Sequence, residues 1–125
     1  MIRVVFQSLF AAILITLSTT TIAREPNCAR PDGWPAGMAF THLKNTGMIS
    51  NDSLDTSKTK VSKLASEKVG KDLYHQVHLV RFVKTSGEDV FAITVNEASS
   101  QECSMSNVDV YLISKRLGDY TSGKE

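Results

Sequence analysis

The stretch that decides the fold runs from Leu73 to Leu117 and reads LYHQVHLVRFVKTSGEDVFAITVNEASSQECSMSNVDVYLISKRL. Two runs in it, Leu73–Lys84 and Val90–Asn96, are rich in β-branched and aromatic residues, as strands are. They flank Ser86–Asp89, whose glycine suits a tight hairpin turn. A third apolar run, Val108–Leu117, follows a polar segment. The pattern predicts three consecutive antiparallel strands.

The first of these runs is apolar on both of its alternating faces. Successive side chains of a strand point to opposite sides, so the run divides into two sets. One set is Leu73, His75, Val77, Leu79, Arg81 and Val83, and the other is Tyr74, Gln76, His78, Val80, Phe82 and Lys84. We therefore predict an interior strand with one face under a helix.

The residues before this stretch predict one helix and one ambiguous segment. Trp34–Ile49 has apolar residues at helical spacing, Asp32 or Gly33 as a cap and Pro35 in the first turn. Thr59–Val69 fits either a helical face or a strand. We favour a strand, because a hairpin would give Leu73–Lys84 a partner; a helix remains the alternative.

The N-terminus has the pattern of a secretory signal peptide. Arg3 supplies a positive charge, and Val4–Leu17 is an apolar run too short to span a bilayer comfortably. The segment Thr21-Ile22-Ala23 has small residues where signal peptidase requires them, so we expect cleavage after Ala23. The alternative is a retained N-terminal anchor. A lipoprotein is disfavoured, because Cys28 lies five residues beyond the cleavage site.

Charge and cysteine content bound the mature chain further. The full sequence has 14 basic and 13 acidic residues, so loss of Arg3 leaves 13 of each. The charges are interspersed and form neither a basic stripe for nucleic acid nor a polybasic membrane patch. Two cysteines in an exported chain predict one disulfide, Cys28–Cys103. Such a bridge contributes roughly 4 kcal/mol by constraining the unfolded chain.

These observations predict an α+β fold in a single domain. An N-terminal helix packs on an antiparallel meander of three to four strands that carries one disulfide. The predicted organisation is a signal peptide at residues 1–23, one domain at 24–118 and a flexible tail at 119–125. After cleavage we expect no membrane anchor and a periplasmic location, with full secretion as a further possibility.

The sequence offers weak material for catalysis. His75 and His78 are three residues apart in a strand, so they point to opposite faces and cannot share one metal ion. No HExxH, CxxC, GxSxG or glycine-rich phosphate loop is present. Glu97 and Glu102 flank the long loop and invite an acid–base hypothesis, but loop carboxylates are usually solvated. We expect no metal, no cofactor and no catalytic residue.

The polar segment Glu97–Asn107 is the predicted recognition loop. It is long for a hairpin connection, and long tethered loops often carry binding residues. Met105 offers an adaptable apolar contact and Glu102 a charged one. Glu97 and the outward-facing Tyr111 would extend this partner-binding surface. The competing interpretation is a loop that is merely pinned by the disulfide.

Three strings carry a resemblance to known proteins. They are Ala65–Gly70 (ASEKVG), Leu73–Val77 (LYHQV) and Ala98–Ser106 (ASSQECSMS), followed by Val108–Lys115. Over about half of the mature chain, the sequence resembles a group of small exported proteins of Gram-negative bacteria. Some such periplasmic proteins are encoded beside secreted toxic effectors and act as their immunity proteins. The resemblance implies a shared fold and compartment more directly than a shared function.

The leading hypothesis is a periplasmic, non-enzymatic protein that neutralises a toxin or lytic enzyme by direct binding. An immunity protein or inhibitor fits the small size, the export signal, the disulfide and the tethered loop. The alternative is a module that binds a small ligand or envelope component between helix and sheet. A small hydrolase that uses the histidines is the third hypothesis.

Overall fold

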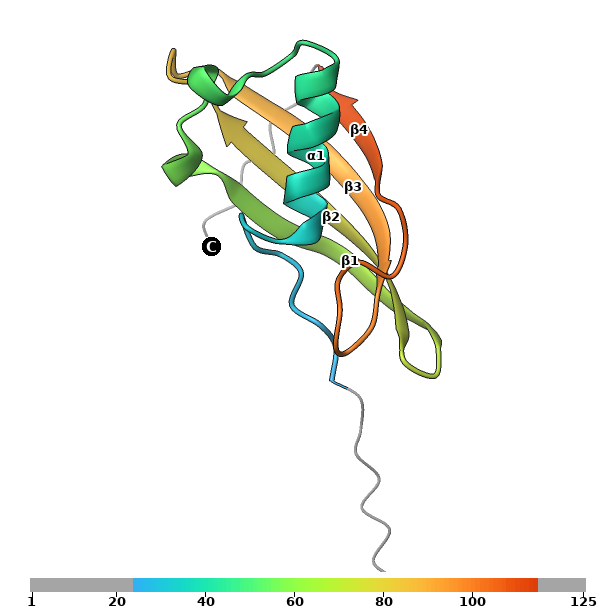
Figure 1. The fold of residues 1–125 in the computed structure, drawn as a ribbon. Helices are drawn as coiled ribbons and strands as arrows, with labels where there is room; N and C mark the ends of the chain where they lie inside the picture. Colours follow the sequence, from blue (N-terminus) through green and yellow to red (C-terminus); the bar gives the residue numbers. More distant parts are fainter. Residues whose placement is uncertain (1–23, 115–125) are drawn as a thin grey trace, which may run out of the picture.

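A computed structural model describes residues 24–114 of the chain, arranged as one helix against one sheet (Figure 1). The predicted signal peptide and its cleavage site, and the predicted tail at 119–125, lie outside the described residues. The helix is α1 (Trp34–Asn45), and the strands are β1 (Lys60–Gly70), β2 (Leu73–Val83), β3 (Asp89–Ala98) and β4 (Asp109–Ile113). Among residues 24–114, no helix is long and apolar enough to cross a membrane.

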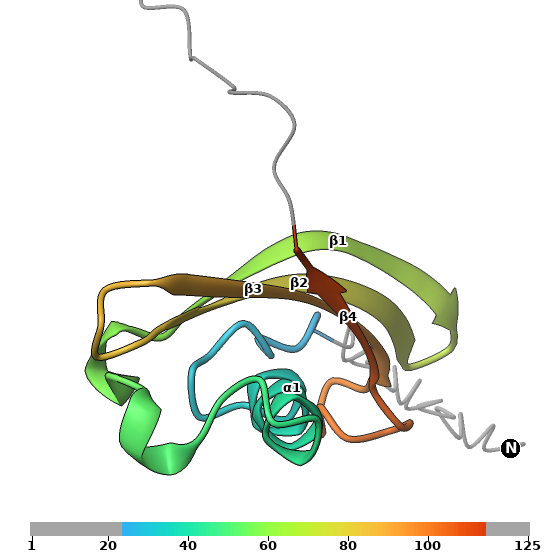
Figure 2. The same cartoon turned by 90° about the horizontal axis from the view of Figure 1, so that it is seen from above.

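The four strands form one antiparallel meander in the order β1-β2-β3-β4. Cys28 and Cys103 are bridged by a disulfide across 75 residues. The predicted α+β class, the interior position of β2 and the disulfide are therefore confirmed. The sheet bends around α1, so that the helix lies on its concave side and the other side is convex (Figure 2).

The helix begins where the sequence predicts and ends four residues earlier than predicted. Pro35 occupies the first turn, where its missing N–H costs nothing. Gly47 has a φ of 76°, a left-handed conformation that ends helices and that suits glycine. Beyond it Ile49 is buried, whereas Met48 is 44 % exposed.

The hydrophobic core lies between α1 and the concave face of β2 and β3. Small residues on the helix bring it close to the sheet. The core comprises Ala36, Ala39, Leu43, Ile49, Leu54, Val80, Phe82, Val90 and Ala92. Burial alternates strictly along β3, as expected of a strand covered on one face only.

The ambiguous segment is a strand, as favoured, but its alternation is interrupted. Register shifts occur between Lys63 and Ala65 and between Lys68 and Gly70. Such a bulge inserts an extra residue and reverses the alternation beyond it. Lys63 consequently pairs with His78 on the concave face, while Ala65 pairs with Val77 on the convex face.

Short connections complete the fold. Two 3-10 turns, Asn51–Ser53 and Thr56–Lys58, link the helix to β1, and Leu54 between them bridges to Lys84. Gly87 takes a φ of 89° in the predicted hairpin turn between β2 and β3. Of the predicted strand Val108–Leu117, β4 comprises Asp109–Ile113, and residues 115–117 lie outside the described residues.

Candidate functional site

The loop that follows β3 is fixed in place by contacts from four parts of the chain. The disulfide joins Cys103 to the N-terminal arm, and the Asn96 amide nitrogen donates to the Cys103 carbonyl oxygen at 2.9 Å. The Trp34 indole N–H donates to the Ser106 carbonyl oxygen at 3.3 Å. Ser100 donates to both carboxylate oxygens of Asp72, at 3.0 Å from its backbone N–H and 2.9 Å from its hydroxyl.

Internal hydrogen bonds add to this fixation. The Ser99 N–H donates to the Glu102 carbonyl at 2.8 Å, and the Glu102 N–H returns a bond to the Ser99 hydroxyl at 3.1 Å. The Ser106 hydroxyl accepts from the Glu97 N–H at 2.8 Å, which fastens the far end of the loop to β3. A loop ordered in this way pays little conformational entropy when it binds.

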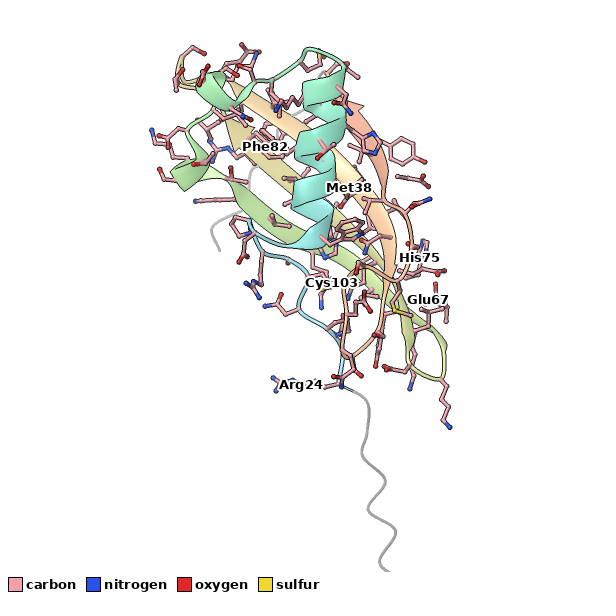
Figure 3. The ribbon with its side chains drawn as sticks, viewed as in Figure 1. Arg24, Met38, Glu67, His75, Phe82 and Cys103 are labelled. Carbon is pink, nitrogen blue, oxygen red and sulfur yellow. A yellow bond between two sulfur atoms is a disulfide. The ribbon has the colours of Figure 1, made fainter. Side chains whose placement is uncertain are left out.

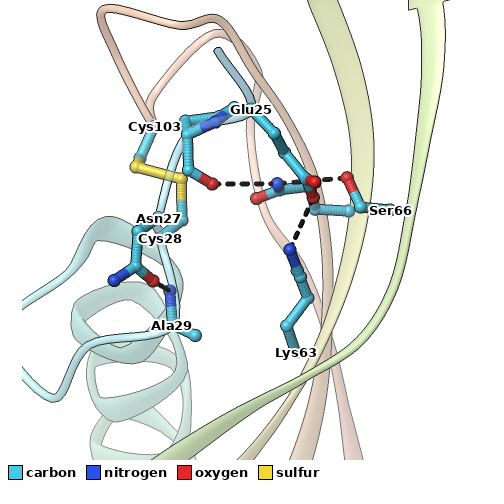
Figure 4. Close-up of polar contacts among 9 residues, drawn as sticks. Glu25, Asn27, Cys28, Ala29, Lys63, Ser66 and Cys103 are labelled. Atoms are coloured by element: carbon cyan, nitrogen blue, oxygen red, sulfur yellow. Dashed lines mark hydrogen bonds and ion pairs between the residues drawn. A yellow bond between two sulfur atoms is a disulfide. The ribbon is translucent and has the colours of Figure 1, made fainter.

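The N-terminal arm crosses the concave side beside the loop (Figure 4). Glu25 forms an ion pair with Lys63 at 2.6 Å, and the hydrogen bond from Lys63 is the main cause that lowers the pKa of this carboxyl. The Gln76 amide donates to the Pro26 carbonyl and to the Ser66 hydroxyl, each at 3.2 Å. The arm is therefore tied to β1 and β2 as well as to Cys103.

The four predicted partner-binding residues divide into two groups. Glu102 and Met105 are exposed on the fixed loop, and Met105 is 47 % exposed. Glu97 and Tyr111 belong to β3 and β4 and lie on the convex face, where Tyr111 is 58 % exposed. The structure thus adds a second surface to the loop that the sequence emphasises.

The convex face of the sheet is uncovered in the described part of the chain and carries a row of apolar side chains. No element of residues 24–114 lies over it (Figure 2). The strand registers align apolar side chains from β2, β3 and β4 on this side, and each is partly exposed or exposed. They are Leu73, Val77, Leu79, Phe91, Ile93, Val95, Tyr111 and Ile113.

The convex face is also electrically polarised along the strands. At one end Lys60 pairs with Arg81, which forms an ion pair with Asp89 at 2.9 Å. At the other end Glu67 and Glu97 flank His75 on neighbouring strands (Glu67 and His75 are labelled in Figure 3), and Asp109 lies opposite Val95. An apolar centre therefore separates a mixed-charge end from an acidic end.

A shallow depression joins the acidic end to the loop. It encloses about 400 Å³ and is lined by His75, Val95, Asn96, Glu97, Ser106, Asn107 and Asp109. Through it, the loop and the convex face form a continuous surface at one end of the molecule.

The concave face contains a buried polar row that the sequence analysis did not single out. Gln76 pairs with Asn96 and His78 with Thr94, and all four side chains are buried. Both ring nitrogens of His78, and one oxygen of each of the other three, lack a hydrogen-bond partner in the described part of the chain. Burial, with a smaller contribution from the Lys63 charge, lowers the pKa of His78. The alternating pattern placed these residues on one face, but did not identify that face as the buried one.

The arrangement offers few groups for chemistry. His75 and His78 lie on opposite faces of β2, as predicted. Within residues 24–114, no three His, Cys, Asp or Glu side chains are placed to hold a metal ion. Both cysteines are in the disulfide, so neither is a thiolate nucleophile in this state.

Comparisons of the chain with protein-family models, curated proteins and solved structures found no match.

Proposed function

We propose that this chain is an exported, non-enzymatic protein that neutralises a toxin or lytic enzyme by binding it in the periplasm. The export signal and the disulfide support the compartment. The observation that carries the binding proposal is the convex sheet face, whose apolar side chains remain in contact with solvent. Contiguous apolar patches of this kind mark interaction sites in soluble proteins.

The shape and charge of the surface define the partner that fits it. A convex face with an apolar centre complements a concave partner surface with an apolar floor. The carboxylates of Glu67, Glu97 and Asp109 favour Arg or Lys at one end of that partner surface. Leu79 and Ile93, paired at the centre of the face, are the expected anchors, and the loop with Met105 lies beside the acidic end.

The small-ligand alternative has one supporting observation. A groove between the helix and the sheet is lined by Phe40, Leu54 and Phe82, among others, and encloses about 240 Å³. Ligand pockets usually enclose about 300–1,000 Å³ and bury most of the ligand. The groove is small for that task, whereas the convex face extends over three strands.

A two-stage experiment tests the proposal. The exported chain, with a photo-crosslinking residue at Leu79, is used to capture partners in the periplasm, and a captured protein is then expressed with and without the chain. We expect a protein that inhibits growth alone and is tolerated when the chain is co-expressed. Leu79→Lys should abolish this protection, while Leu64→Lys on edge strand β1 should retain it. Protection that is unaffected by Leu79→Lys and Ile93→Lys would contradict the assignment of the face.

A further inference from the structure

The two edges of the sheet differ in how they are protected against pairing with another strand. β1 carries Lys60, Lys63, Glu67 and Lys68 and has two register shifts along its length. Charged residues and bulges are the devices by which natural sheets prevent edge-to-edge association. The β1 edge is therefore built to remain unpaired.

β4, at the opposite edge, has no bulge and far less charge (Figure 1). Asp109 is its single charged residue, and its pairing with β3 is regular throughout. Three consecutive large apolar residues are exposed there: Tyr111 at 58 %, Leu112 at 38 % and Ile113 at 37 %. No strand of residues 24–114 pairs with the outer side of β4.

An apolar groove runs along the concave side of this edge. It encloses about 330 Å³ and is lined by His42, Leu43, Thr46, Met48, Val110 and Leu112. A strand added to β4 would place alternate side chains into this groove and the others beside Tyr111 and Ile113. Both faces of an added strand would thus meet apolar surface.

We propose that the β4 edge is an interface between two copies of this chain. The β4 strands pair antiparallel across a two-fold axis and produce one continuous eight-stranded sheet. This arrangement is self-complementary: each copy supplies Val110 and Leu112 to the groove side and Tyr111 and Ile113 to the convex side. Antiparallel pairing centred on Tyr111 places Asp109 opposite Ile113, so the two aspartates do not face each other.

A second copy of the chain is the expected partner of β4, because pairing of two β4 strands gives an assembly that ends at two subunits. A two-fold interface uses the same strand from both copies and ends at two subunits. The eight-stranded sheet then has a charged, bulged β1 at each end, so no unprotected edge remains. The centre of each convex face around Leu79 and Ile93 stays accessible, and the dimer does not require the proposed partner binding, although Tyr111 and Ile113 belong to both surfaces.

Mass measurement of the exported, disulfide-bonded chain tests the proposal. Sedimentation across micromolar concentrations should give twice the mass of the single chain. The double variant Tyr111→Lys/Ile113→Lys should raise the dissociation constant at least 100-fold and leave the circular dichroism spectrum unchanged. Leu64→Lys is the matched control on β1, where Leu64 is 53 % exposed, and should remain dimeric. If the wild-type chain is still a monomer at about 100 μM, a concentration at which even a weak dimer would form, the proposal is overturned.

A spin-label distance distinguishes this dimer from other dimers. Ser62 on β1 is exposed and is separated from its copy by seven strand spacings in the eight-stranded sheet, or about 34 Å. Packing of the two convex faces would bring the β1 strands much closer together, because packed sheets lie about 10 Å apart. Labels at Ser62→Cys should therefore report the long distance, and a short distance would refute edge pairing.

Discussion

Lys63 pairs across strands with the fully buried His78, while its ammonium group reaches Glu25 in the N-terminal arm at 2.6 Å. This relationship connects the buried polar row to the surface. The imidazole has no hydrogen-bond partner within residues 24–114, and a cation lies on its neighbouring strand. Protonation of His78 would therefore bury an unpaired charge near a like charge.

We predict that the free energy of unfolding falls as the pH drops below about 6.5, the usual histidine pKa. The pKa of His78 is lowered in the fold, so the unfolded chain takes up this proton first. The stability contribution is complete above the unfolded pKa and is lost as the pH falls toward the folded pKa. Urea unfolding at pH 7.5 and at pH 5.5, about one unit to either side, measures this loss.

His78→Leu should remove this pH dependence, and His75→Gln on the convex face should retain it. The carboxyls of Glu25, Asp32 and Asp55 also have lowered pKa values, below the ordinary 4.5 for Glu and 3.8 for Asp. Their protonation therefore affects stability below the interval between about pH 5.5 and pH 7.5. If the free energy of unfolding of His78→Leu still falls between about pH 7.5 and pH 5.5 as in the wild type, a group other than His78 causes the pH dependence.

Because one face of β2 is buried and the other is partly exposed, the same Val→Thr substitution should have different effects on the two faces. Val80 is fully buried against the helix, so Val80→Thr should cost about 1–3 kcal/mol by burying a hydroxyl. Val77 is partly exposed on the convex face, so Val77→Thr should change stability by less than about 0.5 kcal/mol. Equal losses in denaturant unfolding would mean that the convex face is covered.

Thr94→Val should be neutral or stabilising, by up to about 1 kcal/mol. The Thr94 hydroxyl is buried and has no hydrogen-bond partner in the described part of the chain, so an isosteric apolar side chain removes a desolvation cost. Thr41→Val on the exposed side of α1 serves as the control. A loss above about 1 kcal/mol would indicate that the hydroxyl makes a stabilising contact.

Loss of the disulfide should act on stability and on the loop together. Replacing Cys28 and Cys103 with Ala should cost roughly 4 kcal/mol, because the bridge closes a long segment of the unfolded chain. Amide exchange at residues 99–107 should accelerate by more than in β2 and β3, since the loop loses its anchor to the arm. Equal protection of the loop in the Ala variant would show that the hydrogen bonds of Asn96 and Trp34 suffice.

The sequence predicted the strands and the disulfide, because alternation and cysteine count are local signals. It did not predict which face of the sheet the helix covers. The concave face contains Gln76, His78, Thr94 and Asn96, whereas the convex face is rich in Leu, Val, Ile and Phe. Hydrophobicity alone favours the wrong face; in the structure, the helix and the N-terminal arm lie on the concave face, where the arm is held by Gln76 and Lys63.

The positions of the predicted partner-binding residues could be foreseen in part for the same reason. Met105 and Glu102 are exposed on a loop that the sequence identified as tethered. Strand registers, which the sequence does not specify, place Tyr111 away from these two residues. The registers also align Glu67, His75 and Glu97. The bulge at Leu64, which shifts the register of β1, has no clear signal in the sequence.

Binding to the captured partner, measured by calorimetry for wild type, Leu79→Lys and Leu64→Lys, tests the central claim most directly. The account predicts that Leu79→Lys loses at least about 2 kcal/mol of binding free energy, or roughly 30-fold in affinity. Leu64→Lys should bind as the wild type does. Equal affinities for all three chains would contradict the claim that the convex face of the sheet is the binding surface.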